Sequence, residues 1–477
     1  MNAGSKVVKE PALAAHTSGD ARASANRDAA PPSRRSFSAQ VAGTLLVRML
    51  MAANSVGTGV IVARWLGAEG LGVFAALNII VATAVQIGSF GLPSASTYFV
   101  AQDRRNLKSV AVNALIFAVL GGGALAGVVA LLAASGAALF VDLPPKLLMI
   151  AAAAIPFQLV TLLGLNIFLG LREVGRFNAL DAAGQSLTLL NTVVTLVLAG
   201  AGLFALVALN TAASIVVSLA VAGFIYWAIR GHDDSGAKKS SPSATLFRRM
   251  AGYGLKFHVA MVASLLIFRA DILIVKYFRG AAEAGVYSVA AQVGMLLMLL
   301  PGVISTLLFP RVASEHDVSG ELTAMVTRHA AFVMLLIFLA AAPASFVLPV
   351  LYGAQFAETS VLLLILLPGV YLVGVESVMV QHFSGTGFPV AISLFWVGTL
   401  VINIALNVAL VPDFGARAAA VASTVSYALI FVLVAAYFRV RTGHSFSTML
   451  CLKADEMCGL LKLGRDGVAF ASRSNRG

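Results

Sequence analysis

Long apolar runs, each about as long as one helical crossing of a membrane, dominate the sequence. A helix that crosses the hydrocarbon core of a bilayer needs about 20 apolar residues, and helices or closed barrels satisfy every backbone polar group there. Apolar residues make up 59% of the chain and charged residues 11%, whereas a soluble domain carries roughly 25% charged residues. The runs therefore predict an all-α polytopic membrane protein of about 12 transmembrane helices. The expected spans are 38–63, 71–99, 109–134, 147–170, 177–200, 203–229, 253–278, 284–309, 327–350, 358–381, 388–411 and 416–438.

Polar stretches divide these spans into two sets of six. We expect a disordered N-terminal tail at 1–37, a six-helix half at 38–230 and a linker at 231–250. A second six-helix half follows at 251–440, and a tail at 441–477. The first tail lacks the apolar core of a secretory signal. In the last tail, the segment from Phe446 to Phe470 could form a helix at the membrane surface.

The cations in the short loops orient the chain in the membrane. If the N-terminus is cytoplasmic, that side holds roughly 25 of the 33 lysines and arginines, which is the excess that marks cytoplasmic loops. The opposite side holds Arg64, Lys146, Arg279 and Arg417. An even number of spans then returns the C-terminus to the cytoplasm, so we expect both termini there.

Several classes of protein are excluded by motifs that the sequence lacks. No Gly-Lys pair occurs, so a phosphate-binding loop is absent. The seven histidines are scattered, and no HExxH or CxxC motif suggests a metal site. Two cysteines, Cys451 and Cys458, cannot form a disulfide framework. The cations are spread over many loops rather than gathered in one tract, which argues against nucleic acid as a partner. We expect no enzyme activity, no cofactor and no metal.

An internal repeat relates the two halves. At an offset of about 213 residues, Gly67 aligns with Gly280 and Gly72 with Gly285. The same offset aligns Gly202 with Gly415 near the other end of each half. Six spans per half is an even number, so the halves should be parallel repeats about an axis along the membrane normal. Such proteins bind substrate in a central cleft near the bilayer midplane.

Five segments carry a family resemblance: IVARWLGAEGLGVF at 61–74, RADILIVKYF at 269–278, GVYSVA at 285–290, LLFPR at 307–311 and LNVALVPDFGARAAAVAS at 406–423. They resemble the polysaccharide (O-antigen and exopolysaccharide) flippases of the multidrug/oligosaccharidyl-lipid/polysaccharide exporter superfamily. The resemblance covers about Phe37 to Arg441. It implies a two-lobed carrier in the bacterial cytoplasmic membrane that moves a polyprenyl-pyrophosphate-linked oligosaccharide to the outer leaflet. The implied partners are that lipid-linked oligosaccharide, membrane lipids, a polysaccharide polymerase and glycosyltransferases.

Charged residues inside spans are the candidates for substrate contact. A charge near the bilayer centre costs about 2.5–3.5 kcal/mol, so it usually faces protein or a wet cavity. Arg48 lies about ten residues into the first span, roughly 15 Å deep at 1.5 Å per residue. It either lines the cleft and binds an anionic head group or caps the carbonyls of a neighbouring helix. Arg269 lies in a family-like segment and is expected to face the cleft.

The seventh span carries further charges beside Arg269. Lys256 and Lys276 lie near its opposite ends and should reach the lipid head groups, with Lys256 as an entry-side cation for substrate. Asp271 is two residues from Arg269, so the two side chains point in different directions. We expect Asp271 to pair with a cation on another helix, and His258 to be a core or interfacial residue.

Acidic and amide side chains in the other spans suggest two further roles. Asp181 and Glu376 are the carboxylates that coupling to H⁺ or Na⁺ would need; alternatively they pair with loop arginines such as Arg172 or Arg176. The asparagines could bind sugar hydroxyls or join helices to one another. These asparagines are Asn54, Asn191, Asn403 and Asn407.

These features predict a flippase that works by alternating access. The pyrophosphate would dock on Arg48 and Arg269, aided by Lys256, while the polyprenyl tail stays in lipid. Within the superfamily the alternatives are a cation-coupled multidrug exporter and a peptidoglycan-precursor flippase. The deep cations favour pyrophosphate over a cationic drug. Outside the superfamily, the alternative is a membrane scaffold that recruits glycan-assembly enzymes.

Overall fold

The computed structural model describes residues 34–137, 140, 143–231, 243–315, 319–386, 388–452 and 456. Every regular element within these ranges is helical. The chain divides into two units, Met1–Leu46 and Val47–Gly477. Of the first unit, residues 34–46 are described, and they are helical. The second unit contains everything discussed below.

The described part of the chain holds nine helical stretches that are long and apolar enough to cross a membrane, so the protein is a multi-pass membrane protein. Two of these stretches are much longer than one crossing, Gly43–Gly88 and Val390–Thr442. The elements are α2 (Arg34–Gly88), α3 (Leu92–Gln102), α4 (Leu107–Ala134), α5 (Pro145–Ala152), α6 (Ile155–Gly170), α7 (Val174–Thr192) with a π-helical extension (Val193–Leu198), α8 (Leu203–Arg230), α9 (Ala244–Arg279), α10 (Ala281–Leu297), α11 (Leu299–Glu315), α12 (Glu321–Ala344), α13 (Leu348–Tyr352), α14 (Thr359–Thr386), α15 (Val390–Thr442) and α16 (Phe446–Leu450).

Glycines make the sharp turns between helical segments. Gly67 interrupts α2 with φ 73° and ψ −175°, and Gly280 separates α9 from α10 with φ 87° and ψ 173°. Positive φ is strongly disfavoured for residues with a Cβ atom. The two glycines that the repeat aligns therefore make the same turn. The other aligned pair differs: Gly415 interrupts α15 with φ 63°, whereas Gly202 has φ −88° and the positive φ lies at Gly200.

In the first half of the chain, two expected spans are broken in the structure. The fourth is divided between α5 and α6, because Pro156 has no N–H group and its ring clashes with the carbonyl four residues earlier. The second, expected at 71–99, stops at Gly88 and resumes as α3. At this break Phe90 and Gly91 both adopt positive φ.

Helix α9 begins at Ala244, inside the range expected to be linker. The Ser243 hydroxyl accepts a hydrogen bond of 3.2 Å from the backbone N–H of Leu246 and so caps the helix. The rest of the expected linker, at 232–242, lies outside the described residues, as does most of the tail at 1–37. Of the expected surface helix after Phe446, the structure describes the five-residue helix α16.

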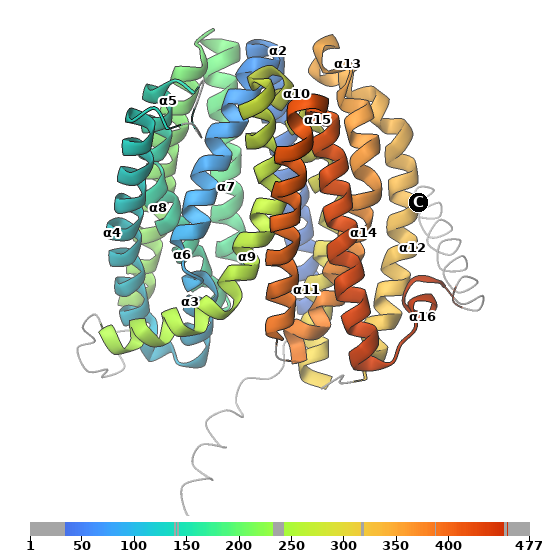
Figure 1. The fold of residues 1–477 in the computed structure, drawn as a ribbon. Helices are drawn as coiled ribbons and strands as arrows, with labels where there is room; N and C mark the ends of the chain where they lie inside the picture. The colour runs from blue at the N-terminus through green and yellow to red at the C-terminus, as the bar shows by residue number, and fades with distance from the viewer. Residues whose placement is uncertain are drawn as a thin grey trace, which may run out of the picture. The chain divides into compact units, whose positions relative to one another are not determined.

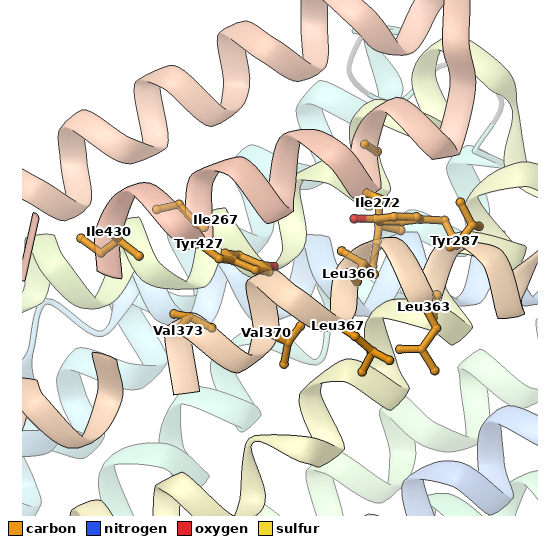
Figure 2. Close-up of a cluster of buried hydrophobic side chains, with 14 of the residues drawn as sticks. Ile267, Ile272, Tyr287, Leu363, Leu366, Leu367, Val370, Val373, Tyr427 and Ile430 are labelled. Atoms are coloured by element: carbon orange, nitrogen blue, oxygen red, sulfur yellow. The ribbon is translucent and has the colours of Figure 1, made fainter. Parts of the chain in front are cut away.

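Two large hydrophobic cores hold the second unit together. One consists mainly of residues from α9, α10, α14 and α15, and Figure 2 shows a part of it around Tyr287 and Tyr427. The other consists mainly of the second part of α2 with α3–α6 and α8. Helix α9 contributes to both, through Leu246 and Met250 at its start and Ile267 later. In Figure 1, α9 therefore runs past α3 before it reaches α10 and α15.

Candidate functional site

A cavity of about 440 Å³ lies between helices from both halves of the sequence. Helices α2, α6 and α7 line it from the first half, and α9 and α10 from the second. Its neutral hydrogen-bonding side chains are Ser55, Thr58, Asn78, Thr83, Gln158, Gln185, Thr188, Ser288 and Gln292. Among the described residues that line this central cavity, Arg269 carries the one charge.

Arg269 presents an exposed guanidinium group to the central cavity. Within the described residues no carboxylate forms an ion pair with it. Asp271, two residues along the helix, is buried and accepts its hydrogen bonds elsewhere. The described lining of the cavity thus holds a cation with no ion-paired carboxylate, which is suited to a bidentate contact with an anionic ligand.

Sequence reasoning missed the neutral polar lining. Gln292 of α10 donates to the Ser55 hydroxyl of α2 at 2.8 Å and to its carbonyl at 3.1 Å, which joins the two halves at the cavity wall. The available signal was the placement of Gln158, Gln185 and Gln292 inside expected spans. A glutamine there needs a polar partner or water, because unsatisfied polar groups are costly in an apolar environment.

Arg48 and Asp181 form an ion pair of 3.5 Å, from Nη1 to Oδ2. The Arg48 side chain remains 40% exposed, and neither residue lines the central cavity. The expectation that Asp181 pairs with Arg172 or Arg176 is therefore wrong. Arg176 instead pairs with Glu173 at 2.6 Å.

Asp271 does not have the cationic partner that the sequence suggested. Its carboxylate accepts hydrogen bonds from the Tyr287 hydroxyl, from the Ser423 hydroxyl at 2.9 Å and from the backbone N–H of Ile272 at 2.8 Å. The Asp271 side chain is fully enclosed, with 1% of its surface exposed. Asp271 thereby joins α9, α10 and α15 through hydroxyl groups, which the spacing of charges along the chain does not reveal.

We expect Asp271→Ala to destabilise the protein by about 2–3 kcal/mol, because two buried hydroxyl groups lose their acceptor. The measurement is the thermal unfolding midpoint of the purified protein in detergent. Glu69→Ala is the matched control, since Glu69 is exposed and should shift the midpoint little. Equal midpoints for the two variants would mean that the hydroxyl–carboxylate cluster contributes nothing to stability.

The other charged candidates lie away from the central cavity lining or outside the described side chains. Glu376 on α14 is 1% exposed, and its Oε1 has no hydrogen-bond partner within the described residues. Lys256 lies in α9, with its side chain outside the described part. His258 is buried, contacts the Ile87 carbonyl at 3.1 Å and stacks on Phe90, as expected for a core histidine.

Two of the buried asparagines connect helical segments to one another. Asn54 of α2 donates to the Ser186 hydroxyl of α7 at 2.9 Å. Asn403 donates to the Ser426 hydroxyl at 3.0 Å, across the kink of α15. Neither residue lines the central cavity. Of the two roles that the sequence left open, these contacts fit the joining of helices.

Glycines bring the backbones of the two halves into direct contact at two places. A Cβ atom added to Gly72 would lie 1.8 Å from the Ala281 carbonyl oxygen, and one added to Gly285 would lie 2.0 Å from that of Ala68. The repeat offset relates the members of each contact, so the crossing of α2 and α10 is reciprocal. A second reciprocal approach joins Gly91 to Gly254.

Comparison with known proteins gives partial matches to two relatives. The chain is 24% identical over 246 residues to a probable low-salt glycan biosynthesis flippase of Haloferax volcanii, covering 50% of this chain and 51% of that protein. It is 29% identical over 167 residues to the probable flippase AglR of the same organism, covering 33% and 35%. The chain thus spans about half the length of the first relative and about a third of the second.

Solved structures share the fold. An inward closed structure of the lipid II flippase MurJ matches with a TM-score of 0.69 and 14% identity, covering 83% of this chain and 86% of that one. An inward-facing multidrug resistance MATE family transporter of the MOP superfamily matches with a TM-score of 0.65 and 16% identity, covering 84% and 98%. The family model described as polysaccharide biosynthesis protein matches residues 61–361, more than half of the chain. The chain therefore belongs to the polysaccharide biosynthesis protein family.

Proposed function

We propose that this protein is a flippase that moves a polyprenyl-pyrophosphate-linked oligosaccharide across the membrane for cell-surface polysaccharide assembly. The composition of the central cavity carries the proposal. Its described lining offers one cation, Arg269, and nine neutral hydrogen-bonding side chains. A pyrophosphate needs a cation, and sugar hydroxyls need neutral donors and acceptors. Dragging the same head group through hydrocarbon would leave its charges and hydroxyls without partners.

Two candidate functions compete with this one. A multidrug exporter of cationic compounds would favour a negatively charged cavity, whereas the one charge of the described lining is positive. A flippase for the peptidoglycan precursor would bind a similar diphosphate head group, so the cavity chemistry suits it equally. The family match and the names of the two relatives favour a polysaccharide precursor.

For the mechanism we propose alternating access between two six-helix halves. Division of α2 at Gly67 and of α15 at Gly415 turns two of the nine membrane-spanning stretches into four spans. Helix α7 with its π-helical extension supplies one more, which supports a total of twelve. The cation distribution along the sequence supports cytoplasmic termini. The membrane we propose is a bacterial inner membrane, as the family resemblance implies. The crossing at Gly72 and Gly285 then faces the outside.

The remaining charged candidates receive roles within this proposal. Arg48 and Lys256 serve as cations that the head group meets before Arg269, and Asp181 holds Arg48 in place through the 3.5 Å ion pair. If transport is coupled to an ion, Glu376 is the carboxylate we propose for it, because its Oε1 is enclosed without a described partner. Polysaccharide polymerase and glycosyltransferases are the proposed partners.

The proposal is tested in vesicles that contain the purified chain. Three fluorescent probes are compared: a polyprenyl-diphosphate oligosaccharide, a peptidoglycan-type polyprenyl-diphosphate disaccharide-peptide, and a lipophilic cationic dye. We expect transbilayer movement of the first probe to exceed that in protein-free vesicles about tenfold or more. Movement of the dye alone would overturn the proposal, and preferential movement of the second probe would replace it with the peptidoglycan alternative. A scaffold would move none of the three.

A further inference from the structure

A second pocket opens beside the central cavity, within the first half of the chain. The two share Phe74, Asn78, Gln158 and Thr188 in their linings, so they adjoin one another, and the second pocket is called the side arm. Helix α8 supplies the inner wall of this side arm. The side arm has a volume of about 90 Å³, well above the roughly 10–15 Å³ that one buried water molecule requires.

The hydroxyl groups of the side arm are arranged as acceptors. Ser214 donates its proton to the Asn210 carbonyl at 3.0 Å, and Thr211 donates to the Ile150 carbonyl at 3.1 Å. The break between α5 and α6 explains the second bond. The backbone N–H of Ala154 donates to the Ala151 carbonyl rather than to the Ile150 carbonyl, so the Ile150 carbonyl can accept from Thr211. Each hydroxyl oxygen keeps lone pairs that a ligand can use.

Amide groups add donors to the same wall. Asn191 donates to Asn210 Oδ1 at 3.2 Å, which leaves the Asn210 amide nitrogen as the donor beside the side arm. Gln158 lies at the mouth of the side arm. Its side-chain amide makes no hydrogen bond to the described residues, so it can both donate and accept. Among the described residues, none that lines the side arm is charged.

We propose that the side arm binds one sugar residue of the transported glycolipid. Closely spaced neutral donors and acceptors match a ligand whose hydroxyl groups do both, while a charged ligand would find no counter-charge among them. The Phe74 ring at the mouth gives the sugar an apolar wall. The inference rests on the proposed function, and it assigns the two parts of the substrate to separate places. The diphosphate binds at Arg269, and the sugar binds in the side arm.

The experiment compares lipids with and without a sugar. Dissociation constants are measured for the full chain in nanodiscs with undecaprenyl diphosphate and with the same lipid carrying glucose, galactose or N-acetylglucosamine. The wild-type protein should bind at least one glycosylated lipid about tenfold more tightly than the sugar-free lipid. Asn210→Ala and Ser214→Leu should each remove this gain and change binding of the sugar-free lipid less than about twofold.

Three variants separate the possible outcomes. Ala212→Leu adds the same side chain at an exposed position of α8 and should change neither constant. Asn210→Ala leaves Asn191 its bond to the Leu209 carbonyl, and retained binding of the sugar-free lipid reports a folded protein. Arg269→Gln should weaken both classes of lipid.

The inference is overturned if the wild-type protein binds all four lipids equally. It is also overturned if the side-arm variants weaken sugar-free and glycosylated lipids alike, or weaken neither. Unchanged binding of both classes of lipid by Arg269→Gln would instead contradict the proposed function. The results for Asn210→Ala and Ser214→Leu would still test the side arm.

Discussion

Replacing Arg269 by glutamine should slow transbilayer movement of a diphosphate-linked oligosaccharide about a hundredfold, which corresponds to about 2.7 kcal/mol. Loss of one partner from an enclosed charge pair costs about 2–5 kcal/mol. Arg269 is the one cation among the described cavity residues, so no neighbour can replace it. Glutamine keeps a similar reach and polarity, so folding should be preserved.

The vesicle assay with the oligosaccharide probe provides the measurement, with matched protein content in each preparation. Arg104→Gln is the control, because Arg104 is an exposed cation outside the central cavity and should transport normally. Arg269→Lys should fall between the two, since it keeps the charge but loses the planar fork that binds two phosphate oxygens. Wild-type rates in Arg269→Gln would show that the diphosphate does not bind here.

Substituting alanine for Gly72 should destabilise the close packing of α2 against α10 by about 3 kcal/mol. This effect is near the upper end of the range for overpacking. The added Cβ atom would lie 1.8 Å from a carbonyl oxygen, and neither helix backbone can yield without moving apart. Gly285→Ala should have the same effect, because its Cβ atom meets the equivalent carbonyl at 2.0 Å. Replacing a glycine by alanine in the interior of a helix otherwise stabilises the protein by roughly 0.5–1 kcal/mol.

Two measurements report on this crossing. The first is the thermal unfolding midpoint, with Gly123→Ala as the control, since a Cβ atom there meets no atom within 4 Å. The second is the distance between spin labels at Glu69→Cys and Ala282→Cys in a chain without its two natural cysteines. The distance should lengthen in both crossing variants and stay unchanged in Gly123→Ala. Unequal effects of the two crossing variants would contradict the reciprocal contact.

The helical, membrane-spanning character could be predicted because it depends on the length and composition of single segments. The turns at Gly67 and Gly280 could also be predicted, because the internal repeat places a glycine at the same position in both halves. The repeat also aligns Gly72 with Gly285, but it does not reveal the close contacts of these glycines with Ala281 and Ala68, because those contacts join distant parts of the chain. The break before Pro156 follows from proline chemistry, but apolar periodicity alone merges α5 with α6.

The candidate site was only partly accessible from sequence. Arg269 could be singled out because a charge inside an apolar run needs a polar environment. The pairing of Arg48 with Asp181 could not, because it joins residues 133 positions apart. For the same reason, sequence spacing could not place Asp271 against Ser423 or Gln158 beside Asn210. A neutral polar side chain in a span does not carry the energetic cost of a charge, so it is not conspicuous in the sequence. The wall of the central cavity was therefore the part of the site that was hardest to predict.

Arg269 is the one charged residue in the described lining of the central cavity, and this has a consequence for the energy source of the proposed transport. An arginine keeps its charge under all physiological conditions, so the unloaded carrier presents +1 at this place. The proposed diphosphate diester substrate would bring two negative charges, so the loaded carrier would present −1. A membrane potential that is negative inside contributes about 2.3 kcal/mol per charge per 100 mV. It would drive the loaded carrier outward and the empty one inward, so voltage alone could power both halves of the cycle.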